Sequence, residues 1–417
     1  MNATQRTRRS RTALFRLSVL TFFIFFGAGA VVPIMGLYLT RGLRFSGSLA
    51  GAILSLAALG VFVAPAIGSV VADRFVSAER LLGFCLLGSA LFMFLLSNAD
   101  SIASVTLLFA GYSLMFGPVM SLNNAVIFHH IERRGGDYGR IRVFGTLGWI
   151  AVAWLFSWFW LRAGRGVLRA ERLGDALVLS AVVYASMGVF GFFLPRGNIY
   201  RNKERPGFIP RDAFSVVFKP EILALTAAVF LCILTDRFYY YGAAIFLKQS
   251  GFDESRILPV LSLGQILEIP AMAYLGRILA RFGAKKVLVL GLLCNGCRYL
   301  LFTFSSNRPE LIIAGIVFHG LTYAFFFSTA LVCLDAFVKP SNRAGVHQLF
   351  TVISSGVGTL VGNLLAGLVY QHAASPSGAS GFRPFWMICL AILIAALVCV
   401  ASLFHGEKGE AVTISTD

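Results

Sequence analysis

The feature that most constrains this chain is a series of apolar stretches, each about 20 residues long, that recurs from one end to the other. A stretch of that length can cross about 30 Å of hydrocarbon as a helix. Uniformly apolar runs favour helices over the alternating strands of a membrane barrel. Twelve can be counted, at approximately 14–39, 47–72, 80–98, 102–127, 139–162, 173–195, 220–248, 256–280, 285–305, 309–333, 345–370 and 383–405. The sequence therefore predicts an all-α membrane protein with twelve transmembrane helices.

The composition and the distribution of charge agree with a membrane location. Of the 417 residues, 57% are hydrophobic and only 13% are charged, which is too apolar for a soluble chain of this length. A net charge of +17 could suggest a nucleic-acid partner in a soluble protein. Here, however, the charged residues gather in the loops between the apolar stretches. We therefore expect the lipid bilayer, and no nucleic acid, as a partner.

The loops also predict the orientation in the membrane. An even number of spans puts both termini on one side, and the loops on that side carry about twice as many Lys and Arg as the others. Because positive loops stay inside, both termini are expected to be cytoplasmic. We expect a multi-pass protein of the cell membrane, namely a bacterial inner membrane.

One long polar segment divides the twelve stretches into two sets of six. It reads RGNIYRNKERPGFIPRDAFSVVFK. The sequence thus predicts five parts, which are a basic cytoplasmic N-terminus at 1–13, a six-helix bundle at 14–195, a cytoplasmic linker at 196–219, a second six-helix bundle at 220–405 and a cytoplasmic tail at 406–417.

The two sets of six share a repeated loop. GSVVADRFVSAER follows the second apolar stretch, and GRILARFGAKK follows the eighth. Aligning Arg74 with Arg281 matches an Arg-Phe pair and a small residue five positions earlier. The copies lie about half the chain apart, which indicates a duplicated unit. The duplication predicts two pseudo-symmetric six-helix bundles.

This organisation resembles the major facilitator superfamily of secondary transporters, in which a basic, glycine-containing loop follows the second helix of each half. Asp73 and Arg74 match that pattern in the first copy, and Arg281 matches it in the second, where Ala280 replaces the acid. The resemblance implies alternating access, with these residues as a cytoplasmic gate that breaks when the carrier opens inward. The alternative is a solvated loop that only fixes topology.

Polar residues within the predicted spans of the first half gather near one segment, DYGRIRVFGTLGW. Arg142, Thr146 and Trp149 recur at i, i+4 and i+7 and so share one face of a helix. A guanidinium can grip two hydroxyls or a carboxylate, and an indole offers a flat apolar face. Asn124 adds an amide from the preceding span. The alternative is that Arg142 extends to the membrane surface while Trp149 packs a helix interface.

In the second half, five polar or ionisable residues fall within predicted spans: Asp236, Gln265, Glu268, Arg298 and His319. An ionisable group there costs roughly 2.5 to 3.5 kcal/mol, so each is a functional candidate. An isolated carboxyl in hydrocarbon keeps its proton, whereas a nearby arginine favours the ionised form. Glu268 beside a movable Arg298 therefore predicts proton coupling, which His319 could share.

These residues also have structural interpretations. Glu268 and Arg298 can form a static buried pair. His319 can be a core histidine whose hydrogen bonds are satisfied, and Asp236 beside Arg237 can be a solvated feature of a water-filled cavity.

The same segments carry a closer resemblance. DYGRIRVFGTLGW resembles the fifth-helix signature of lactose permease and the oligosaccharide:proton symporters, where the second arginine and the tryptophan hold the sugar; here these are Arg142 and Trp149. Arg298 and His319 stand where that family keeps an arginine and a histidine of its proton-coupling cluster. Asp236 matches its seventh-helix aspartate.

The chain also departs from that family. Asn124 stands where a sugar-binding glutamate is expected. Gln265 replaces the coupling glutamate, with Glu268 one turn later, and Thr322 replaces a further glutamate. Gln265-x-x-Glu268 followed by Arg298, together with RVFGTLG, is similar to the nucleoside:proton symporters. DYGRIR and FYYYGAAIF resemble the phenylpropionate permeases.

We therefore expect a secondary active transporter, a proton-coupled symporter that imports a glycoside or a nucleoside. The expected substrate-binding residues are Arg142, Trp149, Thr146, Asn124, Gln265 and Asp236. Proton coupling is expected at Glu268, Arg298 and His319. An aromatic-acid:proton symporter, a non-transporting sensor and a drug exporter are the alternatives. We expect a monomer that uses protons and no cofactor or metal, and no enzyme, because nucleotide-binding loops, zinc-spaced histidines and nucleophile elbows are missing from the sequence.

Overall fold

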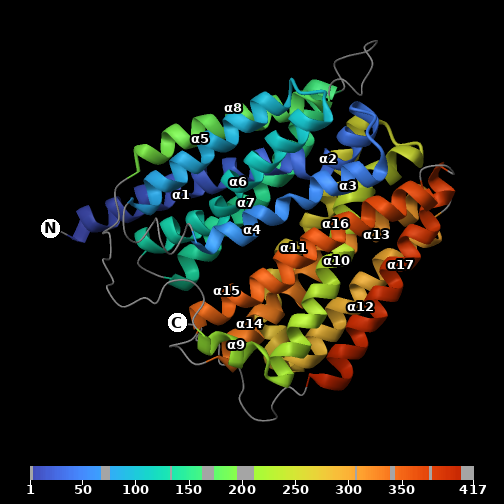
Figure 1. Ribbon diagram of the computed structural model, residues 1–417. Coiled ribbons are helices and arrows are strands. Elements are labelled where there is room, and N and C mark those ends of the chain that lie inside the picture. The colour runs from blue at the N-terminus through green and yellow to red at the C-terminus, as the bar shows by residue number, and fades with distance from the viewer. Residues whose placement is uncertain are drawn as a thin grey trace. The chain divides into compact units, whose positions relative to one another are not determined.

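A computed structural model describes residues 3–66, 76–131, 134–161, 173–194, 211–305, 308–338, 343–374 and 378–404. Every regular element in these ranges is helical (Figure 1). Twelve helical segments are long and apolar enough to cross a membrane, and each overlaps a predicted span. The expected all-α membrane fold is thereby confirmed. Asp73, Arg74, most of the predicted linker and the 406–417 tail lie outside the described residues.

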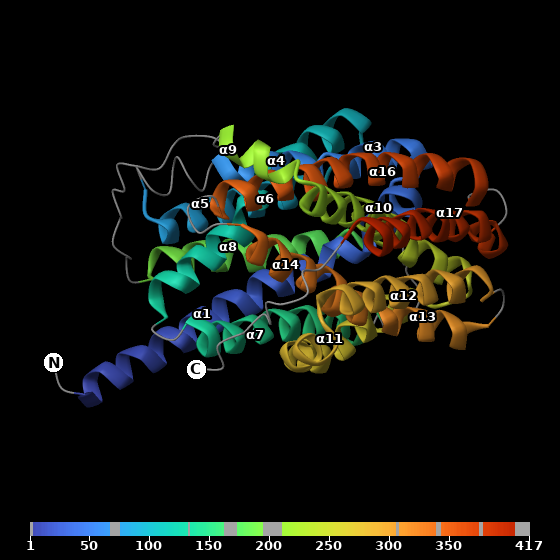
Figure 2. The ribbon, with the colours of Figure 1, turned by 90° about the horizontal axis from the view of Figure 1, so that it is seen from below.

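Contacts between helices divide the chain into two compact units. Unit 1 comprises Met1–Phe45 and Leu56–Phe208. Its described elements are α1 (Ala3–Val31), η1 (Val32–Ile34), α2 (Met35–Leu37), η2 (Tyr38–Gly42), α4 (Ala57–Ala66), α5 (Ala78–Leu96), α6 (Ile102–His130), α7 (Arg134–Leu155), η4 (Phe156–Leu161) and α8 (Asp175–Phe192). Within it α1 packs against α7 and α8, and α5 packs against α6 and α8 (Figure 2).

Unit 2 comprises Ser46–Ser55 and Ile209–Asp417. Its described elements are α3 (Gly47–Ser55), α9 (Arg211–Val217), α10 (Pro220–Gln249), α11 (Glu254–Phe282), α12 (Ala284–Thr303), α13 (Pro309–Thr322), η6 (Tyr323–Ser328), α14 (Thr329–Phe337), α15 (Arg343–Thr351), η7 (Val352–Val357), α16 (Gly358–Val369), η8 (Tyr370–Ala374), α17 (Gly378–Val398) and η9 (Cys399–Leu403). Here α10 packs against α16 and α17, while α13 lies between α11 and α12.

The second span is shared between the units, because α3 groups with unit 2 and α4 with unit 1. The side chains of unit 2 explain this grouping. The Asn363 amide donates to the carbonyl of Leu54 (3.1 Å), and the Tyr241 hydroxyl donates to the carbonyl of Gly47 (2.8 Å). Gly51 lies against the backbone of α16 with no room for a side chain. Such small-residue contacts let membrane helices approach closely.

Local sequence signals set the ends of several helices. Ser101 caps α6 by accepting a hydrogen bond from the backbone N–H of Ser104 (3.2 Å), and Asp253 caps α11 through the N–H of Ser255 (3.0 Å). Gly283 follows α11 with a φ of 79°, a conformation that glycine adopts at little cost. These signals fix how far α11 extends, and α11 carries three of the predicted site residues, Gln265, Glu268 and Arg281.

Two glycine contacts bring a helix that bears predicted site residues close to a neighbouring helix. In unit 2, a Cβ on Gly320 of α13 would clash with the carbonyl of Gly264 on α11. In unit 1, a Cβ on Gly148 of α7 would clash with the carbonyl of Phe22 on α1. Only glycine allows these pairs to pack at this distance, so the glycines position the polar residues beside them.

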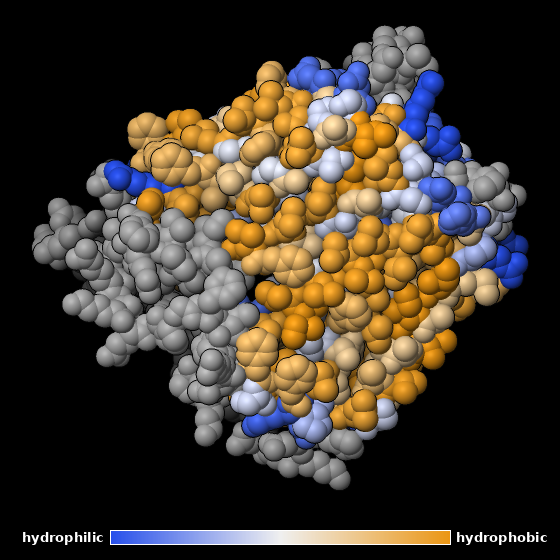
Figure 3. Space-filling model, viewed as in Figure 1, coloured by the Kyte–Doolittle hydropathy of each residue, from blue (hydrophilic) through white to orange (hydrophobic). Residues whose placement is uncertain are grey.

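The visible surface is mostly apolar, and hydrophilic residues gather toward its ends (Figure 3). Large side chains that would be buried in a soluble protein are exposed, for example Leu107 at 71%, Phe15 at 70% and Phe159 at 68%. Such a surface is stable in lipid and not in water.

Candidate substrate and proton site

Arg298 is the centre of the polar cluster in unit 2. It lies on α12 and is only 1% exposed. One terminal nitrogen, Nη1, is 2.6 Å from Nδ1 of His319 on α13. The other, Nη2, donates to the hydroxyl of Tyr299 at 2.7 Å. The structure therefore brings together two of the three residues predicted for proton coupling.

The network continues from Tyr299 to a third helix. Its hydroxyl donates to the backbone carbonyl of Thr235 on α10 at 2.6 Å. This carbonyl belongs to the residue directly before Asp236. A chain of three hydrogen bonds thus joins α13, α12 and α10 through Arg298.

Aromatic rings, and no carboxylate, surround the charge of Arg298. Its guanidinium carbon lies 4.5 Å from the ring centres of both Tyr239 and Tyr299, which is the geometry of a cation–π contact. Tyr239 also stacks on the ring of His319, with centres 4.9 Å apart. No acidic side chain lies within ion-pair distance of Arg298 among the described residues, so the rings carry part of the stabilisation that an acid would give.

Asp236 lies in the same unit and pairs with its neighbour Arg237. Asp236 is 7% exposed, and the guanidinium of Arg237 also lies over the ring of Tyr240 at 5.1 Å. The acid is therefore not isolated.

Gln265 and Glu268 lie one turn apart on α11. Gln265 is 8% exposed and Glu268 is half-buried. Gly264 and Gly320 bring α11 against α13, and His319 lies against Gly264. Both terminal nitrogens of Arg298 are engaged by His319 and Tyr299.

The predicted face of α7 lies in unit 1. The guanidinium of Arg142 lies over the ring of Phe25 on α1 at 4.6 Å, and Thr146 is 8% exposed. Trp149 is half-buried against Gly29 of α1, which fits the helix-packing interpretation for the indole. The three residues lie on one helix, and Arg142 is half-buried.

Asn124 lies on α6, and its Oδ1 accepts a hydrogen bond from the hydroxyl of Tyr138 at 3.3 Å. The preceding Asn123 is buried and bonded to Thr21 of α1 (3.3 Å), so it serves packing. Of the predicted gate residues, Arg281 is exposed near the end of α11 over the ring of Phe282 (5.5 Å). Asp73 and Arg74 lie outside the described residues.

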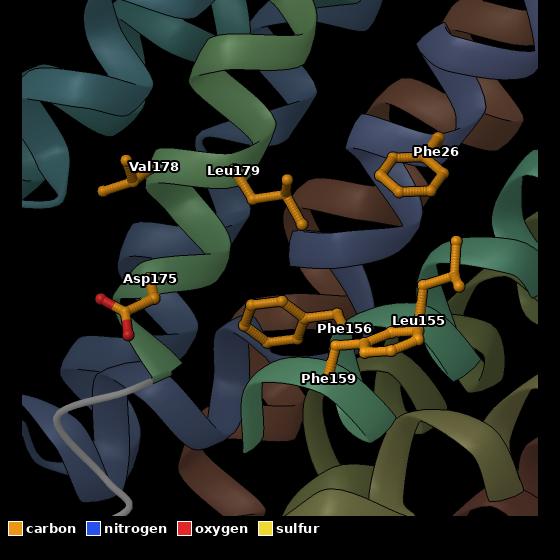
Figure 4. Close-up of a pocket in the computed structure, with 7 residues that line it drawn as sticks. All are labelled: Phe26, Leu155, Phe156, Phe159, Asp175, Val178 and Leu179. Atoms are coloured by element: carbon orange, nitrogen blue, oxygen red, sulfur yellow. The ribbon is translucent and has the colours of Figure 1, made fainter. Parts of the chain in front are cut away.

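A cavity of about 410 Å³ lies elsewhere in unit 1 (Figure 4). It is lined by Phe26, Leu155, Phe156, Phe159, Asp175, Val178 and Leu179. All but one of these are apolar, and none is a predicted site residue. Leu155, Phe159 and Val178 are exposed, and the cavity, with its apolar lining, offers little to a polar solute.

Sequence reasoning missed Tyr299 and Phe25. Tyr299 directly follows Arg298, and adjacent residues of a helix do not face each other, so spacing gives no signal for their bond. Phe25 is one of 39 phenylalanines, and its contact with Arg142 depends on how α1 packs on α7.

Twelve spans, with ionisable groups buried among them, define the class as a multi-pass membrane protein with functional groups inside the membrane. The chain belongs to the family described as "Nucleoside H+ symporter", whose model matches residues 11–409. The predicted resemblance to the nucleoside:proton symporters is thereby confirmed.

The relatives agree with this family. The chain is 28% identical over 408 residues to YegT of Escherichia coli (strain K12), a protein named provisionally as a nucleoside transporter, with 95% of each chain covered. It is 23% identical over 392 residues to the nucleoside permease NupG of the same organism, covering 89% of this chain and 91% of that one. A crystal structure of the nucleoside transporter NupG shares the fold, with a TM-score of 0.82 at 20% identity over 95% of this chain and 100% of that one.

Proposed function

We propose that this protein imports a nucleoside together with a proton by alternating access. The observation that carries the proposal is the family match over residues 11–409. The printed names of the relatives, nucleoside permease among them, support the same class of solute. Of the two solutes expected from the sequence, the nucleoside is therefore the one we propose.

Arg142 is proposed to hold the solute from unit 1. It contacts the ring of Phe25, and its N–H groups form no hydrogen bond with any described residue, so they can serve a ligand. Two parallel donors match the paired hydroxyls of a ribose. The other proposed contacts are Thr146, Trp149 and Asn124 from unit 1 and Gln265 and Asp236 from unit 2.

Glu268 is proposed to carry the proton. It is a half-buried carboxyl in a membrane span, where protonation removes a costly charge. Arg298 is proposed to complete the coupling set, because a fixed positive charge favours the ionised carboxylate when the two approach. His319 is proposed to belong to the same set through its contact with Arg298, which leaves Glu268 as the proton carrier. Asp73, Arg74 and Arg281 are proposed to form the cytoplasmic gate.

The remaining proposals concern the setting. We place the carrier in a bacterial inner membrane, as a monomer, with both termini in the cytoplasm, because the basic loops lie on the side of the termini. A reporter fused after residue 417 that is active only in the cytoplasm tests the orientation.

Uptake into proteoliposomes under an imposed pH gradient tests the function. Wild type, Glu268→Gln and the control Glu310→Gln are given labelled nucleosides, glycosides and aromatic acids; Glu310 is an exposed acid in the first turn of α13. We expect nucleoside accumulation in wild type and in the control. Glu268→Gln should exchange nucleoside across the membrane without accumulating it. Accumulation of another solute class alone would contradict the proposed substrate. Full accumulation of nucleoside by Glu268→Gln would show that Glu268 does not carry the coupled proton.

A further inference from the structure

The contact between Arg298 and His319 fixes where the histidine can hold its proton. A guanidinium has only N–H donors and keeps its charge at any physiological pH. Nη1 of Arg298 is 2.6 Å from Nδ1 of His319, so Nδ1 must accept the hydrogen bond and cannot bear a proton itself. The neutral ring then carries its one proton on Nε2.

Arg298 is held from several sides and so cannot easily release the histidine. Its Nη2 donates to Tyr299, whose own proton is committed to the Thr235 carbonyl, because a carbonyl can only accept. The rings of Tyr239 and Tyr299 each lie 4.5 Å from the guanidinium carbon. We name these two tyrosines the aromatic clamp.

The groups around the imidazole of His319 do not favour a proton on Nδ1. From α12 it meets Arg298, which also holds Tyr299. From α10 it meets the rings of Tyr239 and Tyr240, with Asp236 paired to Arg237 beside them. From α11 it meets the backbone at Gly264, on the helix that also carries Gln265 and Glu268. The nearest charge is therefore the cation of Arg298, which opposes a second positive charge on the ring.

We propose that His319 is a hydrogen-bond donor to the transported solute through Nε2–H and not a carrier of the coupled proton, with Arg298, Tyr239 and Tyr299 as positioning residues that fix this state. The inference rests on the proposed nucleoside transport. The inference restricts the solute to molecules that place a hydrogen-bond acceptor at Nε2–H of His319. Such an acceptor is a carbonyl oxygen or an unprotonated ring nitrogen of a base. His319 keeps 7% of its surface exposed, and Nδ1 is already engaged.

Two substitutions at His319 separate the donor from the proton carrier. His319→Gln keeps an N–H near the Nε2 position but cannot titrate, whereas His319→Leu removes the donor. Under a pH gradient, His319→Gln should accumulate nucleoside to within about threefold of wild type, and His319→Leu should raise the KM about tenfold, as expected for one lost hydrogen bond. His372→Gln, at an exposed histidine in η8, is the control and should match wild type.

The outcomes distinguish this inference from the proposed function. If His319→Gln exchanges nucleoside but fails to accumulate it, His319 carries the proton and the inference is wrong. If wild type itself does not transport nucleosides, the proposed function fails first.

A second readout does not depend on transport. Nitrogen NMR of the full chain with labelled histidine reports which ring nitrogen is protonated, and the His319 signal is the one of six that His319→Gln removes. We expect protonation at Nε2 alone between pH 5 and pH 8 in wild type. A doubly protonated His319 in wild type within that range would overturn the assignment.

Discussion

Arg142 in unit 1 and Arg298 in unit 2 are two arginines within membrane spans that are held in different ways. Each guanidinium stacks on aromatic rings, Phe25 for Arg142 and both Tyr239 and Tyr299 for Arg298. Arg298 is almost fully buried and uses both terminal nitrogens in hydrogen bonds. Arg142 is half-buried and donates to no described residue.

The difference indicates two separate roles for an arginine inside the membrane, one structural and one in binding. A buried arginine with both terminal nitrogens in hydrogen bonds organises the helices around it, because moving it would leave several polar groups unpaired. An arginine with unused donors can bind a solute. The contact with the aromatic ring already offsets part of the free-energy cost of removing its guanidinium from water. We therefore expect Arg298 to matter for the integrity of unit 2 and Arg142 for affinity.

The largest effect should follow replacement of Arg298. Arg298→Leu leaves Nδ1 of His319 unpaired and opens space between α12 and α13, although loss of a buried charge offsets part of the cost. We expect the free energy of unfolding to fall by about 3 kcal/mol, since each orphaned polar group costs roughly 1–3 kcal/mol. Reversible unfolding in mixed micelles measures it.

The paired variant is Arg142→Leu, for which the same measurement should change by less than about 1 kcal/mol. Equal destabilisation by the two variants would mean that Arg142 is also structural, and the contrast between the two arginines would be lost.

The second effect concerns affinity. Arg142→Leu should weaken nucleoside binding about 30-fold, because bonds from a charged donor contribute roughly 1.5–3 kcal/mol. Arg142→Lys should recover only part of this, since an ammonium cannot offer two parallel donors. The Kd from equilibrium binding tests both. Arg140→Leu, two positions away on the exposed side of α7, is the matched control and should bind like wild type.

Several of these features could be predicted from the sequence, because they depend on local properties. Apolar length fixed the number of spans, and helical periodicity placed Arg142, Thr146 and Trp149 on one helix face. The contacts of Arg298 could not be predicted, because one is to the next residue and another ends on a backbone carbonyl. The division of the second span between the two units could not be predicted either, because α3 and α4 belong to one continuous apolar run.

The third effect tests whether helix packing positions both arginine regions. Gly320→Ala in unit 2 and Gly148→Ala in unit 1 would each push a Cβ into a facing backbone carbonyl. Overpacking of this kind costs about 1–3 kcal/mol, so both variants should unfold more easily.

Each glycine variant has a control with open space. A Cβ on Gly296 of α12 or on Gly139 of α7 would meet no atom within 4 Å. Gly296→Ala and Gly139→Ala should be neutral or slightly stabilising, because alanine restricts the unfolded chain. Destabilisation by the controls as large as that by the test variants would show that helix spacing is not the cause.

The smallest effect should come from Tyr138, whose hydroxyl donates to Asn124 beside the Arg142 region at 3.3 Å. Tyr138→Phe removes this long and partly exposed bond and should cost about 0.5–1 kcal/mol of stability. Because the bond helps to orient the Asn124 amide, the nucleoside Kd should also rise, by less than about threefold. Tyr274→Phe, at an exposed tyrosine of α11, should change neither quantity. An unchanged Kd in Tyr138→Phe would leave Arg142 as the main polar contact of unit 1, whereas a large loss would move part of that role to Asn124.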